Sequence, residues 1–296
     1  MTFDARGGKG PAISSNALFA CAVVAVVGGA FLAVLNFPAS SEKGEAPQAI
    51  VALAGTESLQ APDGFSSRPA TYYFETLARL DPSASASLQS RLGKADGKTG
   101  GDHADIVLIH GAALLKERAT DLAQADTSHI DGILVMTRDR LKSASRAGNI
   151  WCDGNQYADL DESALRNPAA FEQSFARLEG PLQDYGFELM AHLLLAADDG
   201  ARNPVARGPV THADKAALQG VVMSMLSDPQ VVPLIMAAQT SADPDELRRK
   251  LNVCELGATA MTALKTLPQD TKGRVFADLV KQLAEGNADL AGLTHY

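Results

Sequence analysis

The longest apolar stretch of the chain lies near its N-terminus. Residues 17–37 hold no charged side chain, and Asn36 is the one polar side chain among them. A helix of this length rises about 30 Å, which matches the hydrocarbon core of a membrane. Arg6 and Lys9 precede the stretch, and positively charged flanks stay in the cytoplasm. The pattern predicts a cytoplasmic tail over residues 1–16, a signal-anchor helix over 17–37 and an exported remainder.

Two other interpretations of this stretch have weaker support. A cleaved signal peptide has an apolar region of about 7–15 residues, shorter than this run, although Ala39, Ser40 and Ser41 would serve as a weak cleavage site. A lipoprotein would carry its lipid on Cys21, but the apolar run continues well past this cysteine. We therefore expect an uncleaved membrane anchor.

Small residues recur at every fourth position of the expected membrane helix. Such a stripe lets a second helix approach closely, so it indicates packing against another membrane protein or a second copy of this chain. The same spacing also arises by chance in a span rich in alanine and glycine. The stripe consists of Cys21, Ala25, Gly29 and Ala33.

Beyond the membrane helix the pattern changes twice. Residues 38–68 are rich in Pro, Ser, Gly and Ala, with one short apolar run at 50–53, and predict a tether. Over residues 69–296 the apolar positions recur mainly with the period of an α-helix. Leucines seven positions apart predict one amphipathic helix over 102–124. Its polar face is expected to carry His103, His110, Glu117 and Asp121.

Further helices follow in the same region. One is expected over residues 130–144, and the short joint at 126–128 predicts that it forms an antiparallel hairpin with the helix before it. The apolar stretch 171–196 is interrupted by Gly180 and Pro181. Because proline breaks or bends a helix, this stretch predicts one kinked helix or two short ones.

Signals that start helices support these assignments. Thr211 and Asp214 have the spacing of a capping box, in which each side chain bonds the backbone of the other residue. Helices over 244–267 and 269–285 finish the chain. The exported part is therefore predicted to be all-α and helical-bundle-like, with about nine or ten helices in one domain or in two closely packed ones. A cap followed by proline recurs at Asp81, Asn167, Asp228 and Asp243.

The cysteines indicate a disulfide. The chain has three, and with Cys21 in the membrane the exported pair is Cys152 and Cys254. Two thiols in an oxidising compartment most simply form a disulfide, although two buried free thiols are the alternative. Closing a loop of about 100 residues adds up to about 4–5 kcal/mol in the chain-entropy model. Cys152 lies in an irregular segment that is our candidate interaction loop, with Trp151, Asp153 and Tyr157 as its contact residues.

Composition excludes several classes of ligand. The chain has 26 Lys and Arg against 35 Asp and Glu, a net charge of -9. This balance argues against nucleic acid as a partner, because binding to phosphates needs a basic surface. Residues 93–99 resemble a phosphate-binding loop, but the spacing of their glycines is short by one and no strand precedes them, so we expect no nucleotide.

Candidate metal ligands lack complete sets. His103 and His110 are about two helical turns apart, roughly 10 Å, which is too far to share one ion. Glu188 and His192 have the i, i+4 spacing at which one metal reaches both, but the sequence indicates no third ligand. The acidic segment 153–162 departs from a calcium-binding EF-hand at its required Gly and Glu positions. We expect no metal and no cofactor.

These observations favour a protein that is not an enzyme. We expect a single-pass protein of the bacterial inner membrane, with a periplasmic C-terminal domain, that serves as an accessory or assembly subunit of a membrane protein complex. The alternative is a membrane-tethered periplasmic enzyme, such as a lytic transglycosylase-like protein acting on the cell wall, or a small-ligand binder. In the enzyme, Glu57 or Glu162 would be the general acid, since each is followed by serine.

Overall fold

The computed structural model describes most of the region expected to form the exported domain. The expected membrane helix over 17–37, with its stripe of small residues, lies outside the described residues, as do the caps at Asn167 and Asp243. None of the helices in the described part has the length and apolar character needed to cross a membrane. The described residues are 65–95, 100–157, 181–225, 228–230, 232 and 249–285.

These residues form helices and turns without a strand, which confirms the all-α prediction for this part of the chain. An isolated β-bridge joins Asp153 to Asn252. In chain order the elements are α3 (Arg68–Leu80), α4 (Pro82–Lys94), α5 (Gly100–Glu117), α6 (Ala119–Ala123), α7 (Thr127–Arg146), η2 (Ile150–Cys152), η3 (Gly154–Tyr157), α10 (Pro181–Arg202), α11 (His212–Met225), α14 (Val253–Lys265) and α15 (Gln269–Ala284).

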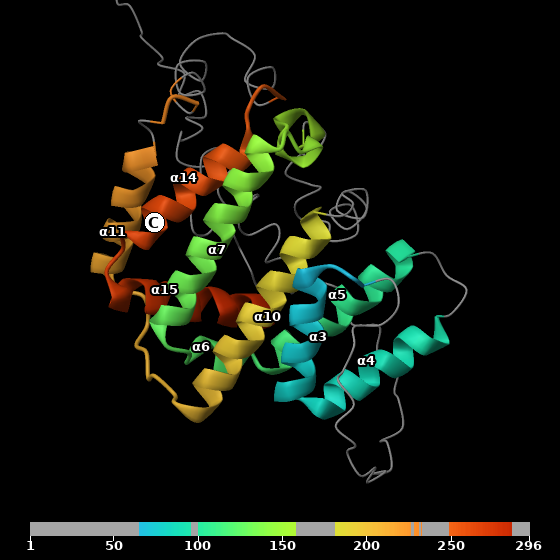
Figure 1. Cartoon of the computed structure of the whole chain (residues 1–296). Helices are drawn as coiled ribbons and strands as arrows, with labels where there is room; N and C mark the ends of the chain where they lie inside the picture. Colours follow the sequence, from blue (N-terminus) through green and yellow to red (C-terminus); the bar gives the residue numbers. More distant parts are fainter. Residues whose placement is uncertain are drawn as a thin grey trace, which may run out of the picture.

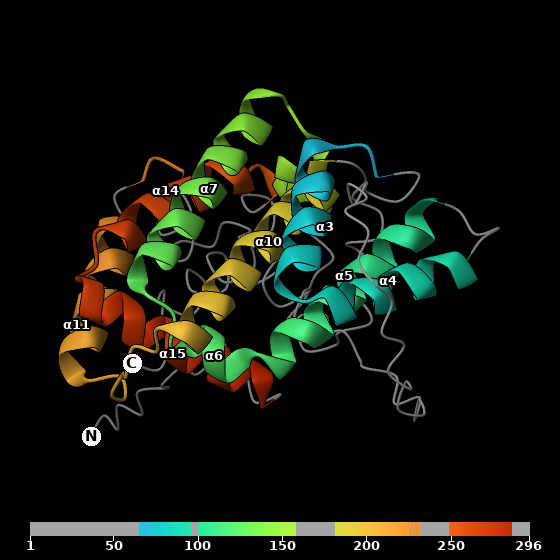
Figure 2. The ribbon, with the colours of Figure 1, turned by 60° about the horizontal axis from the view of Figure 1, so that its bottom comes forward.

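Helix α10 is the element around which its neighbours pack. It contacts α3, α5, α6 and α7, and it lies between α3 and α7 in both views of the molecule (Figures 1 and 2). On the far side of α7, helix α14 packs along α7, and α11 and α15 adjoin α14 and α7 respectively. The side chains of α10 that are almost fully buried include Leu189, Met190, Leu193 and Leu194.

The domain begins slightly before the predicted boundary at residue 69. Phe65 is buried, and its ring lies 5.3 Å from that of Phe74 and 5.6 Å from that of Phe187. Ser67 is the N-cap of α3, because its side chain accepts a hydrogen bond from the backbone of Ala70. The last residues assigned to the tether therefore belong to the helical domain.

Two glycines allow helices to approach closely. A Cβ atom at Gly200 in α10 would lie 1.9 Å from the backbone oxygen of Asp121 in α6. A Cβ atom at Gly111 in α5 would lie 2.4 Å from the sulfur of Met190 in α10. Because real Cβ atoms do not approach other atoms so closely, the backbone contact at Gly200 requires a residue without a side chain, whereas at Gly111 the flexible Met190 side chain would have to move.

The helix expected over 102–124 is divided in two. Helix α5 ends at Glu117 and α6 begins at Ala119, so that α6 changes direction and buries Leu122 against α10 and α15. His110 is also buried, whereas the sequence places it on a polar face. The prediction fails here because α5 is buried on more than one face: Val107, Gly111 and Leu114 are buried in addition to the predicted stripe of leucines and alanines.

The expected hairpin is wrong for a related reason. Asp126 does cap α7, accepting a hydrogen bond from the backbone of Ser128 at 2.8 Å. However, α7 packs mainly against α14 and α10 rather than against α5. The short α6 reorients the chain between α5 and α7, so a short joint does not place these two helices side by side.

Most of the other helices that the structure describes begin close to where the sequence predicts. Asp81 caps α4, and Thr211 and Asp214 form both backbone hydrogen bonds of the capping box, at 3.2 and 2.8 Å. Helix α10 runs from Pro181, which is the first described residue after the gap at 158–180, so the interruption predicted at Gly180 and Pro181 lies at the edge of the described residues. Helix α15 lies within one residue of its expected range, whereas the helix expected over 244–267 is not continuous: α14 begins at Val253, with Asn252 as its cap.

A buried ion pair joins α11 to α15. The Asp214 side chain is 1% exposed and accepts two hydrogen bonds from the Arg274 guanidinium, each 2.8 Å long. Thr271 donates a third at 2.6 Å, in addition to the capping-box bonds. Chiefly because of Arg274, the pKa of Asp214 is far below its usual range. Both oxygens of this carboxylate are therefore fully satisfied by neighbouring residues.

Candidate functional site

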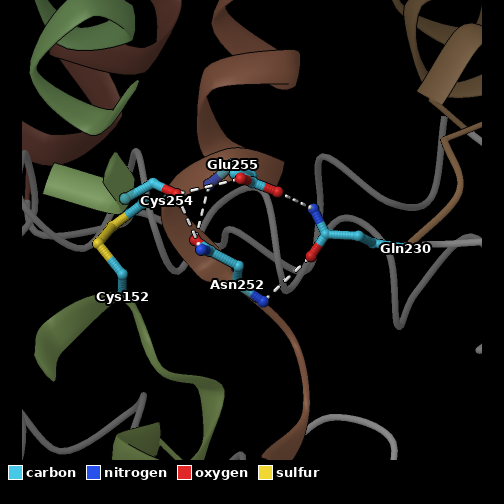
Figure 3. Close-up of a disulfide and its surroundings, with 6 residues drawn as sticks. Cys152, Gln230, Asn252, Cys254 and Glu255 are labelled. Atoms are coloured by element: carbon cyan, nitrogen blue, oxygen red, sulfur yellow. Dashed lines mark hydrogen bonds between the residues drawn. A yellow bond between two sulfur atoms is a disulfide. The ribbon is translucent and has the colours of Figure 1, made fainter. Parts of the chain in front are cut away.

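The structure joins the two cysteines expected to pair. Cys152, at the end of η2, and Cys254, in the first turn of α14, form a disulfide with a Cα–Cα distance of 5.0 Å (Figure 3). Both residues are buried. The bond therefore fixes the irregular segment that follows α7 to the start of α14.

Hydrogen bonds centred on Asn252 surround the disulfide. The Asn252 side chain accepts a bond from the backbone of Glu255 at 3.0 Å and donates one to Ser145 of α7 at 2.9 Å. Its backbone donates to the side chain of Gln230 at 3.0 Å, and Gln230 in turn donates to the Glu255 carboxylate at 3.2 Å (Figure 3). We call Ser145, Gln230, Asn252 and Glu255 the Asn252 cluster. It holds three separate parts of the chain in one place.

The candidate interaction loop is only partly exposed. Trp151 is 8% exposed and belongs to the hydrophobic core, so the domain itself covers most of its side chain. Asp153 is exposed, and its carboxylate accepts a hydrogen bond from the backbone of Asn155 at 2.9 Å. Tyr157 ends η3. The large apolar side chain that this segment does expose is Ile150, which is 67% exposed.

A second candidate site is a cleft of about 390 Å³ between the start of α3 and the middle parts of α7 and α10. Arg140 reaches it from α7 and donates a hydrogen bond to the Glu188 carboxylate. Glu188 comes from α10. The cleft is lined by Arg68, Pro69, Tyr72, Arg140, Glu188 and His192.

An aromatic pair forms one wall of this cleft. The Tyr72 ring and the His192 imidazole meet edge to face, with centroids 5.9 Å apart. Burial lowers the pKa of His192, although the Glu188 carboxylate opposes this effect. The imidazole is therefore neutral at neutral pH, and the formal charges of the lining are the two guanidinium groups and the single carboxylate.

Among the candidate metal ligands that the structure describes, one pair shares a site. Glu188 and His192 line the same cleft. By contrast, His103 lies near the backbone oxygen of Ala95 at 3.4 Å, and His110 is buried, so these two histidines share no site. Among the described residues no three His, Cys, Asp or Glu side chains are arranged to hold a metal ion. Glu57 and Glu162 lie outside the described residues.

Sequence analysis missed Arg68, Tyr72 and Arg140. They lie on two elements that are distant from α10 in sequence, and only the packing of α3 and α7 on α10 brings them to the cleft. No motif links their positions. The i, i+4 spacing of Glu188 and His192 was the one local signal of this site.

No protein-family model, curated protein or solved structure matches the chain. By architecture, the described part is an all-α domain with an internal disulfide and a small cleft that two arginines line.

Proposed function

We propose that the protein is a membrane-anchored interaction protein, an accessory or assembly subunit of a bacterial membrane protein complex, with its helical domain in the periplasm. The uncharged segment 17–37 and its basic N-terminal flank support the anchor and its direction. The pairing of Cys152 with Cys254 supports export, because structural disulfides persist mainly in oxidising compartments.

The observation that carries the proposal is the exposure of Ile150 beside the disulfide. Isolated apolar residues are common on protein surfaces. Ile150, however, lies between the end of α7 and the bonded Cys152, and next to the buried Trp151. Because the disulfide at Cys152 fixes the backbone near Ile150, this segment loses little conformational entropy when a partner covers the side chain, which favours binding.

The most perturbed carboxylate in the described part has a structural explanation. Asp214 owes its low pKa to Arg274 and to hydrogen bonds from Thr271 and Thr211. These partners join α11 to α15 and leave no free oxygen for a substrate. This arrangement supports a structural role for the pair and is consistent with a domain that binds rather than transforms its partner.

Co-purification tests the proposal. The full-length chain, expressed at its native level with a tag after Tyr296, is extracted in mild detergent, and its partners are identified by mass spectrometry. We expect a stoichiometric membrane protein partner. A chain that is recovered alone, or only with copies of itself, would overturn the accessory-subunit function.

Two matched variants test whether Ile150 is part of the surface that contacts the partner. Ile150→Glu places a charge on the proposed contact, and Met223→Glu does so on α11 at a side chain that is 63% exposed, against 67% for Ile150. We expect the partner to be lost from the first variant and retained by the second. If the Ile150 variant keeps its partner at the wild-type level, Ile150 is not part of the contact.

A further inference from the structure

We propose that the cleft between α3, α7 and α10 binds a small organic anion, a carboxylate carried on an apolar or aromatic body, with Arg68 as its main anchor. This inference concerns a ligand site separate from the disulfide end of the domain, and it stands or falls independently of the interaction proposed above.

The charges of the lining favour an anion. Arg140 is already paired with Glu188, and the exposed fractions of these two side chains are 43% and 23%. Arg68 begins α3 and is exposed, and no acidic partner holds it among the described residues. Asp184, one turn before Glu188, does not line the cleft and accepts a hydrogen bond from Ser67 instead. A ligand carboxylate would therefore compensate the unmatched guanidinium and accept its paired N–H groups.

The aromatic wall favours a ligand with a flat or apolar body. The Tyr72 and His192 rings pack edge to face at 5.9 Å beside Arg68, so they offer an apolar surface close to the charge. The neutral His192 adds one hydrogen-bonding group at this wall. An inorganic anion would satisfy the arginine but leave this surface without a partner.

The size of the cleft limits the ligand. Ligand pockets have volumes of about 300–1,000 Å³, and 390 Å³ is near the lower end of that range. With about 30 Å³ for each water-sized group, the cleft holds a molecule of about a dozen such groups. A compound of the size of benzoate fits within this limit, whereas a folded partner does not.

Packing between the helices fixes the walls of the cleft. Helix α3 packs against α10, where the ring of Tyr73 lies 6.1 Å from that of Phe187, and the ring of Phe65, just before α3, lies 5.6 Å from the same ring. The pair of Arg140 and Glu188 joins α7 to α10 within the lining of the cleft. Walls fixed in this way reduce the entropy that is lost when a ligand binds.

Calorimetric titration of the full-length chain in detergent with sodium benzoate tests the inference, with benzamide as the neutral analogue of the same shape. We expect a millimolar or tighter dissociation constant for benzoate and no measurable binding of benzamide. Arg68→Gln is expected to weaken benzoate binding about tenfold, because it removes a charge-assisted hydrogen bond. Arg79→Gln, at an exposed arginine near the other end of α3, is the control and should bind benzoate like the wild type.

A second comparison separates an aromatic carboxylate from a bare anion. Tyr72→Ala should weaken benzoate binding but leave the weaker binding of inorganic phosphate unchanged. Phosphate that binds more tightly than benzoate would overturn the assignment of an organic carboxylate. Equal benzoate binding by the wild type and Arg68→Gln, equal binding of benzamide and benzoate, or no binding of benzoate would overturn the site itself.

Discussion

The guanidinium of Arg274 bonds both carboxylate oxygens of Asp214, each at 2.8 Å, although the two residues lie 60 positions apart. This pair connects α11 to α15, two helices that share few other contacts. The carboxylate is buried, whereas the Arg274 side chain remains 26% exposed. Removing the ion pair between Asp214 and Arg274 should lower the free energy of unfolding of the domain.

Asp214→Asn should destabilise the domain by about 2–3 kcal/mol, because it removes the charge opposite Arg274 and one acceptor of the capping box. This expected loss of stability is smaller than the loss on breaking a fully buried ion pair, because water still reaches the Arg274 side chain. Urea unfolding monitored by circular dichroism gives the difference. Asp139→Asn is the control, because Asp139 pairs with Arg138 at an exposed site and should change stability by about 0.5 kcal/mol or less.

Two buried tyrosines should respond in opposite directions to the loss of their hydroxyl groups. Burial raises the pKa of both, that of Tyr185 to about 12. The Tyr185 hydroxyl is within hydrogen-bond distance of Thr137, at 3.1 Å, whereas that of Tyr73 has no hydrogen-bond partner among the described residues. Tyr185→Phe should therefore destabilise the protein by about 1 kcal/mol, and Tyr73→Phe should stabilise it by a similar amount. Equal effects in chemical denaturation would contradict this difference.

Glycine-to-alanine substitutions should also differ in sign. Gly200→Ala places a Cβ atom against the backbone of α6, which cannot move away easily, and should destabilise the domain by about 3 kcal/mol. Gly132 lies in α7 and has no atom within 4 Å of its added Cβ. Gly132→Ala should raise stability by about 0.5–1 kcal/mol through helix propensity alone. Melting temperatures of the two variants provide the comparison.

Acidification should weaken the fold before its carboxylates are protonated. Burial, with a smaller contribution from Arg91, lowers the pKa of His110 below its usual value, and burial also lowers the pKa of His192. The unfolded chain therefore takes up protons first, so stability is full above pH of about 6.5 and falls as the pH decreases below this value. A His110→Gln, His192→Gln double variant should lose most of this slope between about pH 6.5 and pH 5 in urea titrations. An unchanged slope would assign the effect to other groups.

The disulfide determines how many cysteines of the chain react with an alkylating reagent. In the oxidised protein, denatured without reductant, one cysteine should react with an alkylating reagent, and this should be Cys21. Reduction should expose Cys152 and Cys254 and lower stability by up to about 4–5 kcal/mol, since their sequence separation is 102. Mass spectrometry gives the count. Three reactive cysteines without reductant would show that the bond does not form in the cell.

Local signals in the sequence predicted the parts of the fold that depend on local chemistry. The cap at Asp81 and the capping box of Thr211 and Asp214 require only neighbouring residues, and both are present. The all-α class also follows from local periodicity. The break between α5 and α6 was missed because burial of Leu122 against α10 and α15, rather than any Gly or Pro, redirects the chain there.

The candidate sites depend on contacts that local patterns do not contain. Trp151 suggested an exposed aromatic, but the fold buries it and exposes Ile150 instead. Arg68 and Arg140 lie 72 positions apart, and they share a cleft because α3 and α7 pack on opposite sides of α10. Only the spacing of Glu188 and His192 indicated their common surface in advance.

The bond between Cys152 and Cys254 also makes a covalent ring of the intervening chain, which contains α10 and α11. A protease that cuts one peptide bond within this ring opens it but does not release a fragment. The two halves remain a single molecule, with α10 still packed between α3 and α7. The domain can thus be cut once between the cysteines and keep its subunit mass, and the cut becomes visible only when the sulfurs are reduced.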